Sequence, residues 1–198
     1  MFRMFHCLAV IGVCGLSAGV AQAADLPFWV IDPAQSQLSF EATQQGAAIK
    51  GQFAHFTGEI SFDPAQPESS HAVIKIDMKS ADTKSKDRDS SLKGADFFSA
   101  ESFPESIYTV SKFEKSDENQ YVAIGELEMR GVKHPLNLPL TITFSTDEQG
   151  QELASAMGEA SLMRLDFGVG QGEWKDTQAI GNEVKISVSI KASKAPSP

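Results

Sequence analysis

The sequence predicts an all-β protein, namely one antiparallel β-barrel of about eight strands with a short inserted helix near residues 85–93. Apolar and polar residues alternate with period two through most of the chain, as in strands with one buried face. The connections are short and lack βαβ spacing, which favours a meander. Eight such strands suit a closed barrel that can hold a small ligand, and a two-sheet sandwich is the alternative.

The chain begins with a predicted signal peptide, residues 1–23. A basic start at Arg3 precedes an apolar run over residues 7–20 and a small-x-small end at Ala21-Gln22-Ala23. The run is shorter than the roughly 20 residues of a membrane-spanning helix. We therefore expect cleavage after Ala23 and a periplasmic protein. The rest is predicted to be one domain, residues 24–194, with a flexible tail at 195–198.

Cysteine content and charge exclude several kinds of function. Both cysteines, Cys7 and Cys14, lie in the segment expected to be removed. The mature chain then has no thiol for a disulfide, a thiolate metal site or a nucleophile. The net charge is −9, which argues against binding to nucleic acid or to anionic lipid headgroups.

The predicted strands follow one another along the chain, each recognised by its alternating apolar residues. They lie near residues 38–42, 49–62, 72–78, 108–113, 121–129, 136–144, 153–162 and 184–190.

One of these strands contains a predicted irregularity. Large residues change parity between Ile49 and Phe53 on one side and Phe56, Ile60 and Phe62 on the other. Because a one-residue slip would turn a strand inside out, we expect a β-bulge or break near Ala54-His55. Two interpretations stay open, a barrel rim beside a pocket and curvature needed only for closure.

The predicted helix has start and stop signals. Thr83 or Ser85 can cap its first turn, and Gly94 can end it. Leu92 is its large apolar residue.

Motifs for catalysis or metal binding are weak. The three histidines of the predicted mature chain, His55, His71 and His134, are not at metal-ligand spacing. The chain has no Gly-x-Ser-x-Gly elbow, and the glycine cluster at 168–172 predicts a turn rather than a dinucleotide site.

Phenylalanine and a few cations indicate a binding site instead. Rings lining an unfilled barrel would contact a long apolar guest, and a few polar groups at the mouth would orient it. The candidate cations for a headgroup are Arg88, Arg164 and Lys84. The predicted ligand-binding residues are Phe40, Phe53, Phe56, Phe62, Ile76, Arg88, Leu92, Phe97, Phe98, Phe103, Leu127, Met129, Leu138 and Arg164.

An ordered set of motifs resembles the YceI-like family along essentially the whole mature chain. The motifs are Trp29-Val-Ile-Asp-Pro33, Ser36-x-Leu-x-Phe40, Gly51-x-Phe53, Ile60-x-Phe-Asp-Pro64, Lys86-Asp-Arg-Asp89, Asp96-Phe-Phe98, Phe103-Pro104, Gly125-x-Leu127, Arg130-Gly-Val132 and Arg164-x-Asp-Phe-Gly168. The resemblance implies a lipocalin-like barrel around a long hydrophobic channel, often dimeric. It also implies periplasmic or secreted members that bind polyisoprenoid chains, quinones or fatty-acid-like molecules.

Two features qualify what the resemblance implies. Many members of the family carry a Lys-His or His-Leu segment where this chain has Gln44-Gln45-Gly46-Ala47. The chemical identity of the ligand's headgroup is therefore left open. The Gly170-x-Gly-Glu-Trp174 ending is similar to a subgroup associated with membrane cytochrome b561 partners.

The first hypothesis for the function is a carrier with no enzymatic activity and no cofactor beyond a bound isoprenoid lipid or quinone. The alternatives are an accessory subunit of a membrane redox protein and a lipid hydrolase or isomerase.

Overall fold

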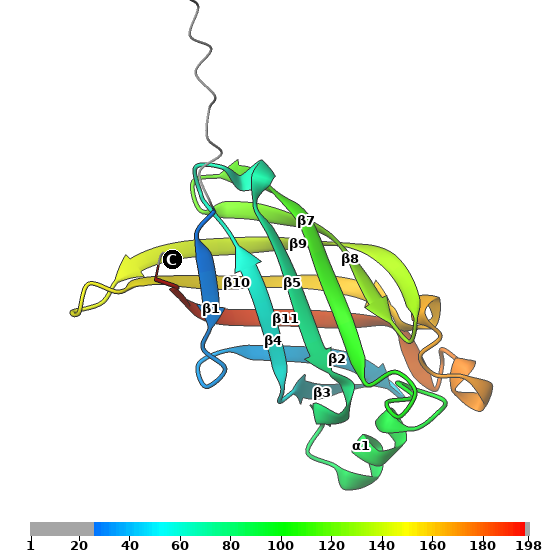
Figure 1. Cartoon of the computed structure of the whole chain (residues 1–198). Coiled ribbons are helices and arrows are strands. Elements are labelled where there is room, and N and C mark those ends of the chain that lie inside the picture. Colours follow the sequence, from blue (N-terminus) through cyan, green and yellow to red (C-terminus); the bar gives the residue numbers. More distant parts are fainter. Residues whose placement is uncertain (1–25, 197–198) are drawn as a thin grey trace, which may run out of the picture.

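The computed structural model describes residues 26–196, so the predicted signal peptide and the last two residues of the predicted tail lie outside the described residues. Eight strands close into a ring in which every neighbouring pair is antiparallel (Figure 1). In ring order they are β1 (Phe28–Ile31), β4 (Phe56–Ser61), β5 (His71–Asp77), β7 (Glu105–Asp117), β8 (Gln120–Met129), β9 (Val132–Thr146), β10 (Glu152–Met163) and β11 (Ile180–Lys194). The predicted eight-stranded barrel is confirmed, and the sandwich alternative is not.

Three further strands branch from this ring. They are β2 (Gln37–Gln44), β3 (Ala47–Phe53) and β6 (Ala81–Asp82). The long strand β11 has two partners on the same edge, since β1 pairs with residues 192–194 and β2 pairs with residues 180–189. Strand β3 then pairs with β2, and β6 pairs with β3. The sheet therefore divides along its length into a closed part and a branch.

The predicted break at Ala54-His55 is confirmed, and it marks the point of division. Strand β3 ends at Phe53, and β4 begins at Phe56. Before the break the chain pairs with β2 and β6, whereas after it the chain pairs with β1 and β5. Both phenylalanines are buried in the interior. The parity change thus keeps two successive large residues inward while the strand changes partners.

The predicted helix is also confirmed, as α1 (Lys86–Lys93), which follows Ser85 and stops at Gly94. Its start is held from within the helix, because Asp89 Oδ1 accepts hydrogen bonds from the Thr83 backbone N–H at 2.8 Å and from Thr83 Oγ1 at 2.6 Å. The described residues also form four single-turn 3₁₀ helices, η1 (Pro67–Ser69), η2 (Met78–Ser80), η3 (Arg164–Phe167) and η4 (Gly172–Lys175). Within residues 26–196 the structure contains no helix long and apolar enough to cross a membrane.

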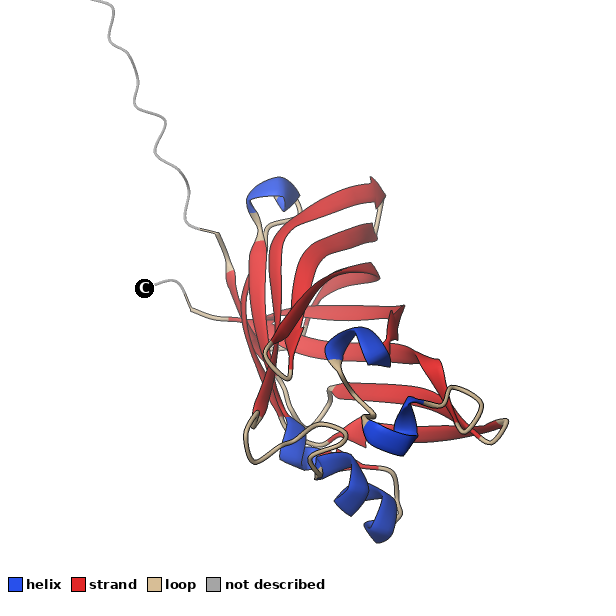
Figure 2. Ribbon diagram, turned by 90° about the vertical axis from the view of Figure 1, so that its right-hand side faces the viewer, coloured by secondary structure: helices blue, strands red, loops and turns tan. Residues whose placement is uncertain are grey.

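The barrel has two unlike ends. Helix α1 lies at the lower right of Figure 1 with η3 and η4 to its right, and Figure 2 shows η1 apart from the other short helices. We call the α1 side the helix end. The opposite end holds a contiguous group of rings and is called the aromatic end; its members are Trp29, Phe62, Phe113, Tyr121 and Phe144.

Close backbone approach in β10 gives a first stability prediction. A Cβ on Gly158 would overlap the backbone carbonyl oxygen of Pro139 on β9. Backbone atoms cannot move without disturbing the ladder, so we expect Gly158→Ala to destabilise the protein by about 2 kcal/mol. Gly58→Ala is the matched control, because its new Cβ would meet only the movable ends of Ile31 and Ile74. Denaturant unfolding that gives equal losses for the two variants would refute this explanation.

Candidate functional site

The barrel encloses a cavity of about 180 Å³, here called the inner cavity. Its walls come from all eight strands of the ring together with β2 and β3. Three of the β11 residues that line it, Ile186, Val188 and Ile190, are only half-buried by the protein. Seven of the predicted ligand-binding residues line this cavity, namely Phe53, Phe56, Phe62, Ile76, Leu127, Met129 and Leu138.

The few polar atoms in this wall are already hydrogen-bonded within the protein. Trp29 Nε1 donates to the Phe62 carbonyl oxygen at 2.9 Å, and Ser106 Oγ donates to the Glu128 carbonyl oxygen at 2.6 Å. The Tyr108 hydroxyl donates to the Leu136 carbonyl oxygen at 2.8 Å. The wall residues include no acidic, basic or histidine side chain. Nearly all contacts that the inner cavity offers to a guest are therefore apolar.

A second cavity of about 320 Å³, the outer cavity, lies at the helix end. It contains four predicted residues, Phe40, Arg88, Leu92 and Phe97. Unlike the inner cavity it has a partly polar wall, to which α1 and the residues just before it contribute Thr83, Ser85, Asp87 and Ser91.

Arg88 is tied to the start of its helix. Its Nε donates to Thr83 Oγ1 at 2.8 Å, and its Nη2 donates to the Thr83 carbonyl oxygen at 3.2 Å. These bonds fix the direction of the guanidinium and use two of its three nitrogens. Arg88 is thus a cation held in place in the wall of the outer cavity.

Aromatic rings separate the two cavities. Phe40 of the outer wall and Phe53 of the inner wall have ring centroids 5.3 Å apart. Phe98 lies in neither wall and packs against Phe53, with ring centroids 5.9 Å apart. The Phe40 ring lies against the backbone of Gly51, where any Cβ would overlap it. A guest that occupied both cavities would have to move these rings.

Arg164 lies elsewhere than the sequence suggested. Only 3% of it is exposed, and it lines neither cavity. Burial lowers the pKa of its guanidinium. The guanidinium donates to the carbonyl oxygens of Gly181, Val169, Gly170, Trp174 and Ile180. Because Arg has five N–H donors, no donor is left for a headgroup.

The other predicted residues outside the cavity walls have local contacts. Phe103 packs toward the backbone of Gly131. Lys84 is exposed and forms an ion pair with Asp82.

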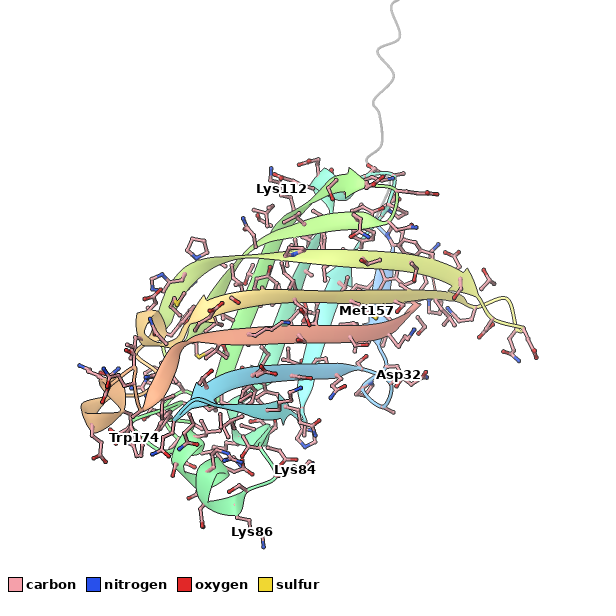
Figure 3. All side chains as sticks on the ribbon, turned by 180° about the vertical axis from the view of Figure 1, so that it is seen from behind. Asp32, Lys84, Lys86, Lys112, Met157 and Trp174 are labelled. Atoms are coloured by element: carbon pink, nitrogen blue, oxygen red, sulfur yellow. The ribbon has the colours of Figure 1, made fainter. Side chains whose placement is uncertain are left out.

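Many wall residues are not among the predicted ligand-binding residues, and two of them are large aromatic side chains that matter for the site. Trp174 lines the outer cavity beside Phe97, with ring centroids 5.6 Å apart, and Figure 3 shows it at the same end as Lys84 and Lys86. It lies in the 3₁₀ turn η4, where no strand period marks its direction. Phe144 lines the inner cavity, and its place in the alternation of residues 136–144 was the available signal.

Both tyrosines of the chain are buried, which gives a pH prediction. Burial raises the pKa of Tyr108 and of Tyr121 above the ordinary value of 10.0. Unfolded tyrosine loses its proton near pH 10, whereas the folded protein keeps both protons to higher pH. The folded state therefore binds more protons there, and the free energy of unfolding should fall as pH rises above about 10.

Absorbance of the phenolate against pH, with unfolding curves at pH 9 and 11, checks this. We expect phenolate to appear together with loss of structure. Titration of both tyrosines near pH 10 in a protein that stays folded would contradict the prediction.

In residues 26–196 no three or more His, Cys, Asp or Glu side chains are grouped so that they could hold a metal ion.

The chain is similar in sequence and in structure to several known proteins. A UPF0312 protein of Shewanella baltica is 28% identical over 165 residues, which cover 81% of this chain and 85% of the relative. The crystal structure of Burkholderia cenocepacia BcnA has a TM-score of 0.76 and 28% identity, over 81% of this chain and 98% of that one. A polyisoprenoid binding domain from Saccharophagus degradans shares the fold, with a TM-score of 0.68 and 14% identity over 84% of this chain and 98% of the other.

The family comparison covers most of the chain. The YceI-like domain matches residues 29–192, which begin in β1 and end in β11 and so include residues of every strand of the ring and of its branch. The chain therefore belongs to the YceI-like family.

Proposed function

We propose that the protein is a non-enzymatic binding or carrier protein for a long-chain isoprenoid lipid, either a polyprenyl chain or an isoprenoid quinone. The observation that carries this proposal is the inner cavity, whose wall is apolar and whose few polar atoms are already bonded. Such a wall stabilises a hydrocarbon chain and leaves no group for acid–base or nucleophilic chemistry.

The chain of the lipid would thread from the outer cavity into the inner one. At about 180 Å³ the inner cavity is smaller than the roughly 300–1,000 Å³ of a typical ligand pocket. Side chains must therefore move to admit a long guest. Met78 and Met129 in the wall are unbranched and adaptable, and the pair Phe40 and Phe53 stands where the cavities meet.

The headgroup would lie in the outer cavity beside Arg88. Arg88 is the one cation among the residues that line this cavity in the described part of the chain, and Asp87 lies there as well. A pyrophosphate group needs several cations or a metal ion. One arginine beside a carboxylate and an aromatic wall suits a neutral or weakly polar head such as a quinone ring or an alcohol.

The family and the fold agree with this proposal. The matched domain is YceI-like, and the polyisoprenoid binding domain of Saccharophagus degradans has the same fold. At 14% identity that second likeness concerns the fold alone. The membrane redox partner and the homodimer stay predictions.

We further propose that the protein works in the periplasm after loss of residues 1–23. The order of basic, apolar and small residues at the amino end supports this. The intact mass of protein from the periplasmic fraction should correspond to a chain that begins at Ala24. A mass that includes residues 1–23 would contradict export with cleavage.

A titration with matched ligands tests the binding function. Trp174 lies in the outer cavity, so its fluorescence should respond when a polyprenyl alcohol or an isoprenoid quinone binds. Arg88→Gln should weaken the binding of either by about tenfold, because a bond to a charged donor is lost. The headless hydrocarbon of equal length should bind the variant and the parent equally.

Lys86→Gln is the matched control, since Lys86 is an exposed residue on the same helix and outside the wall. Saturable binding by the parent, with loss in Arg88→Gln alone, supports the assignment. If the parent binds none of these ligands, the proposed function is wrong.

A further inference from the structure

The aromatic end closes the inner cavity with a group of packed rings. Phe62 stands at its centre, in edge contact with Phe113 at 4.9 Å and Tyr121 at 5.3 Å between ring centroids. These three side chains are almost completely buried. Edge-to-face packing of this kind is favourable and makes a rigid end wall.

Phe144 is the exception in this wall. It lines the inner cavity, yet 40% of it is exposed. Its ring stacks on Phe62 at 6.1 Å and lies 5.5 Å from Trp29. Phe144 is therefore part of the cavity wall and is also exposed to solvent.

The pairing of the strands explains this exposure. Strand β8 pairs with β9 only as far as Thr141, so Phe144 lies on the part of β9 beyond β8. Its cross-strand neighbour on β10 is Ala154, whose methyl group is too small to cover the ring. Phe144 is therefore held from inside by Phe62 and Trp29 and left open outside.

We propose that Phe144 sets the maximum length of the hydrocarbon chain that the barrel binds, an inference that rests on the proposed lipid-binding function. A chain inserted from the helix end passes the apolar wall and meets this ring last. Each methylene buried before that point strengthens binding about fourfold, the equivalent of about 0.8 kcal/mol. Carbons beyond it find no further wall and add nothing.

A series of straight-chain primary alcohols of increasing length measures this limit. For the parent we expect affinity to rise about fourfold per carbon and then to stop rising at one chain length. Phe144→Ala removes the ring and opens the end, so the rise should continue for several more carbons. Phe144→Trp enlarges the ring and should stop the rise at a shorter chain.

Phe28→Ala is the matched control. Phe28 has nearly the same exposure, 42%, and lies on β1 outside the cavity wall. It should leave the limit unchanged. Thermal unfolding checks that each variant folds, and the two opposite substitutions at Phe144 keep the test informative if one of them is unstable.

The outcomes separate the two proposals. If the parent shows the rise and the limit but neither Phe144 variant moves that limit, the assignment of Phe144 is overturned while lipid binding stands. If the parent binds no alcohol of any length, the proposed function fails, and the role of Phe144 fails with it.

Discussion

Replacing Ala156 by phenylalanine should remove long-chain lipid binding while the barrel stays folded. Ala156 lines the inner cavity on β10, between Ile142 of β9 and Ile190 of β11. A phenyl ring there would fill space that the guest needs. If it displaces only three methylenes, at about 0.8 kcal/mol each, the affinity falls about 60-fold.

Met157→Phe is the control for this substitution. Met157 is the next residue of the same strand and is 56% exposed, so its side chain points away from the cavity. Figure 3 shows it on the outer side of the barrel.

The stability of Ala156→Phe is a second check. Filling a packed core with extra carbons costs about 1–3 kcal/mol, whereas filling a real cavity should cost less. Ligand titration and denaturant unfolding measure both effects. Full binding by Ala156→Phe would show that the guest does not occupy the barrel.

Arg164→Ala should destabilise the protein more than Gly158→Ala or Arg130→Ala. The side chain is buried and joins five carbonyl oxygens, at 2.7 to 3.5 Å, over residues 169–181. Hydrogen bonds from charged donors are worth about 1.5–3 kcal/mol each, and the carbonyl groups would be left without their donors. We expect a loss of about 4 kcal/mol in the free energy of unfolding.

Arg130→Ala is the comparison for Arg164, because Arg130 donates to the carbonyl oxygens of Ala95 and Phe97 alone. Its loss should be about 1–2 kcal/mol. Arg164→Lys should recover little, because an ammonium group has three donors and lacks the planar fork. Equal losses for Arg164→Ala and Arg130→Ala would contradict the role given to the five bonds.

The strands and their inward faces could be predicted from the sequence because side chains alternate strictly along a strand. Leu138 and Leu140 are buried as their period required. The break before Phe56 followed from parity alone. The exchange of partners at that break did not, because it depends on β1 and β2 lying end to end along β11. Local period carries no information about such distant pairing.

The site could be predicted less well than the fold. Phenylalanine content indicated an apolar guest, and seven predicted residues do line the inner cavity. The sequence predicts Arg164 as a headgroup ligand. It does not show whether an arginine is buried against backbone carbonyl groups or is free to bind a ligand. The sequence marks Phe144 only as one member of an alternating strand, because its exposure depends on where the neighbouring strand β8 ends.

Native mass spectrometry of protein isolated from its own periplasm, followed by organic extraction, tests the central claim most directly. We predict an additional mass on the folded protein, which the extract identifies as a long-chain isoprenoid lipid and which is absent from Ala156→Phe prepared in the same way. Parent protein that carries no lipid, or lipid retained equally by Ala156→Phe, would contradict a carrier that holds its guest inside the barrel.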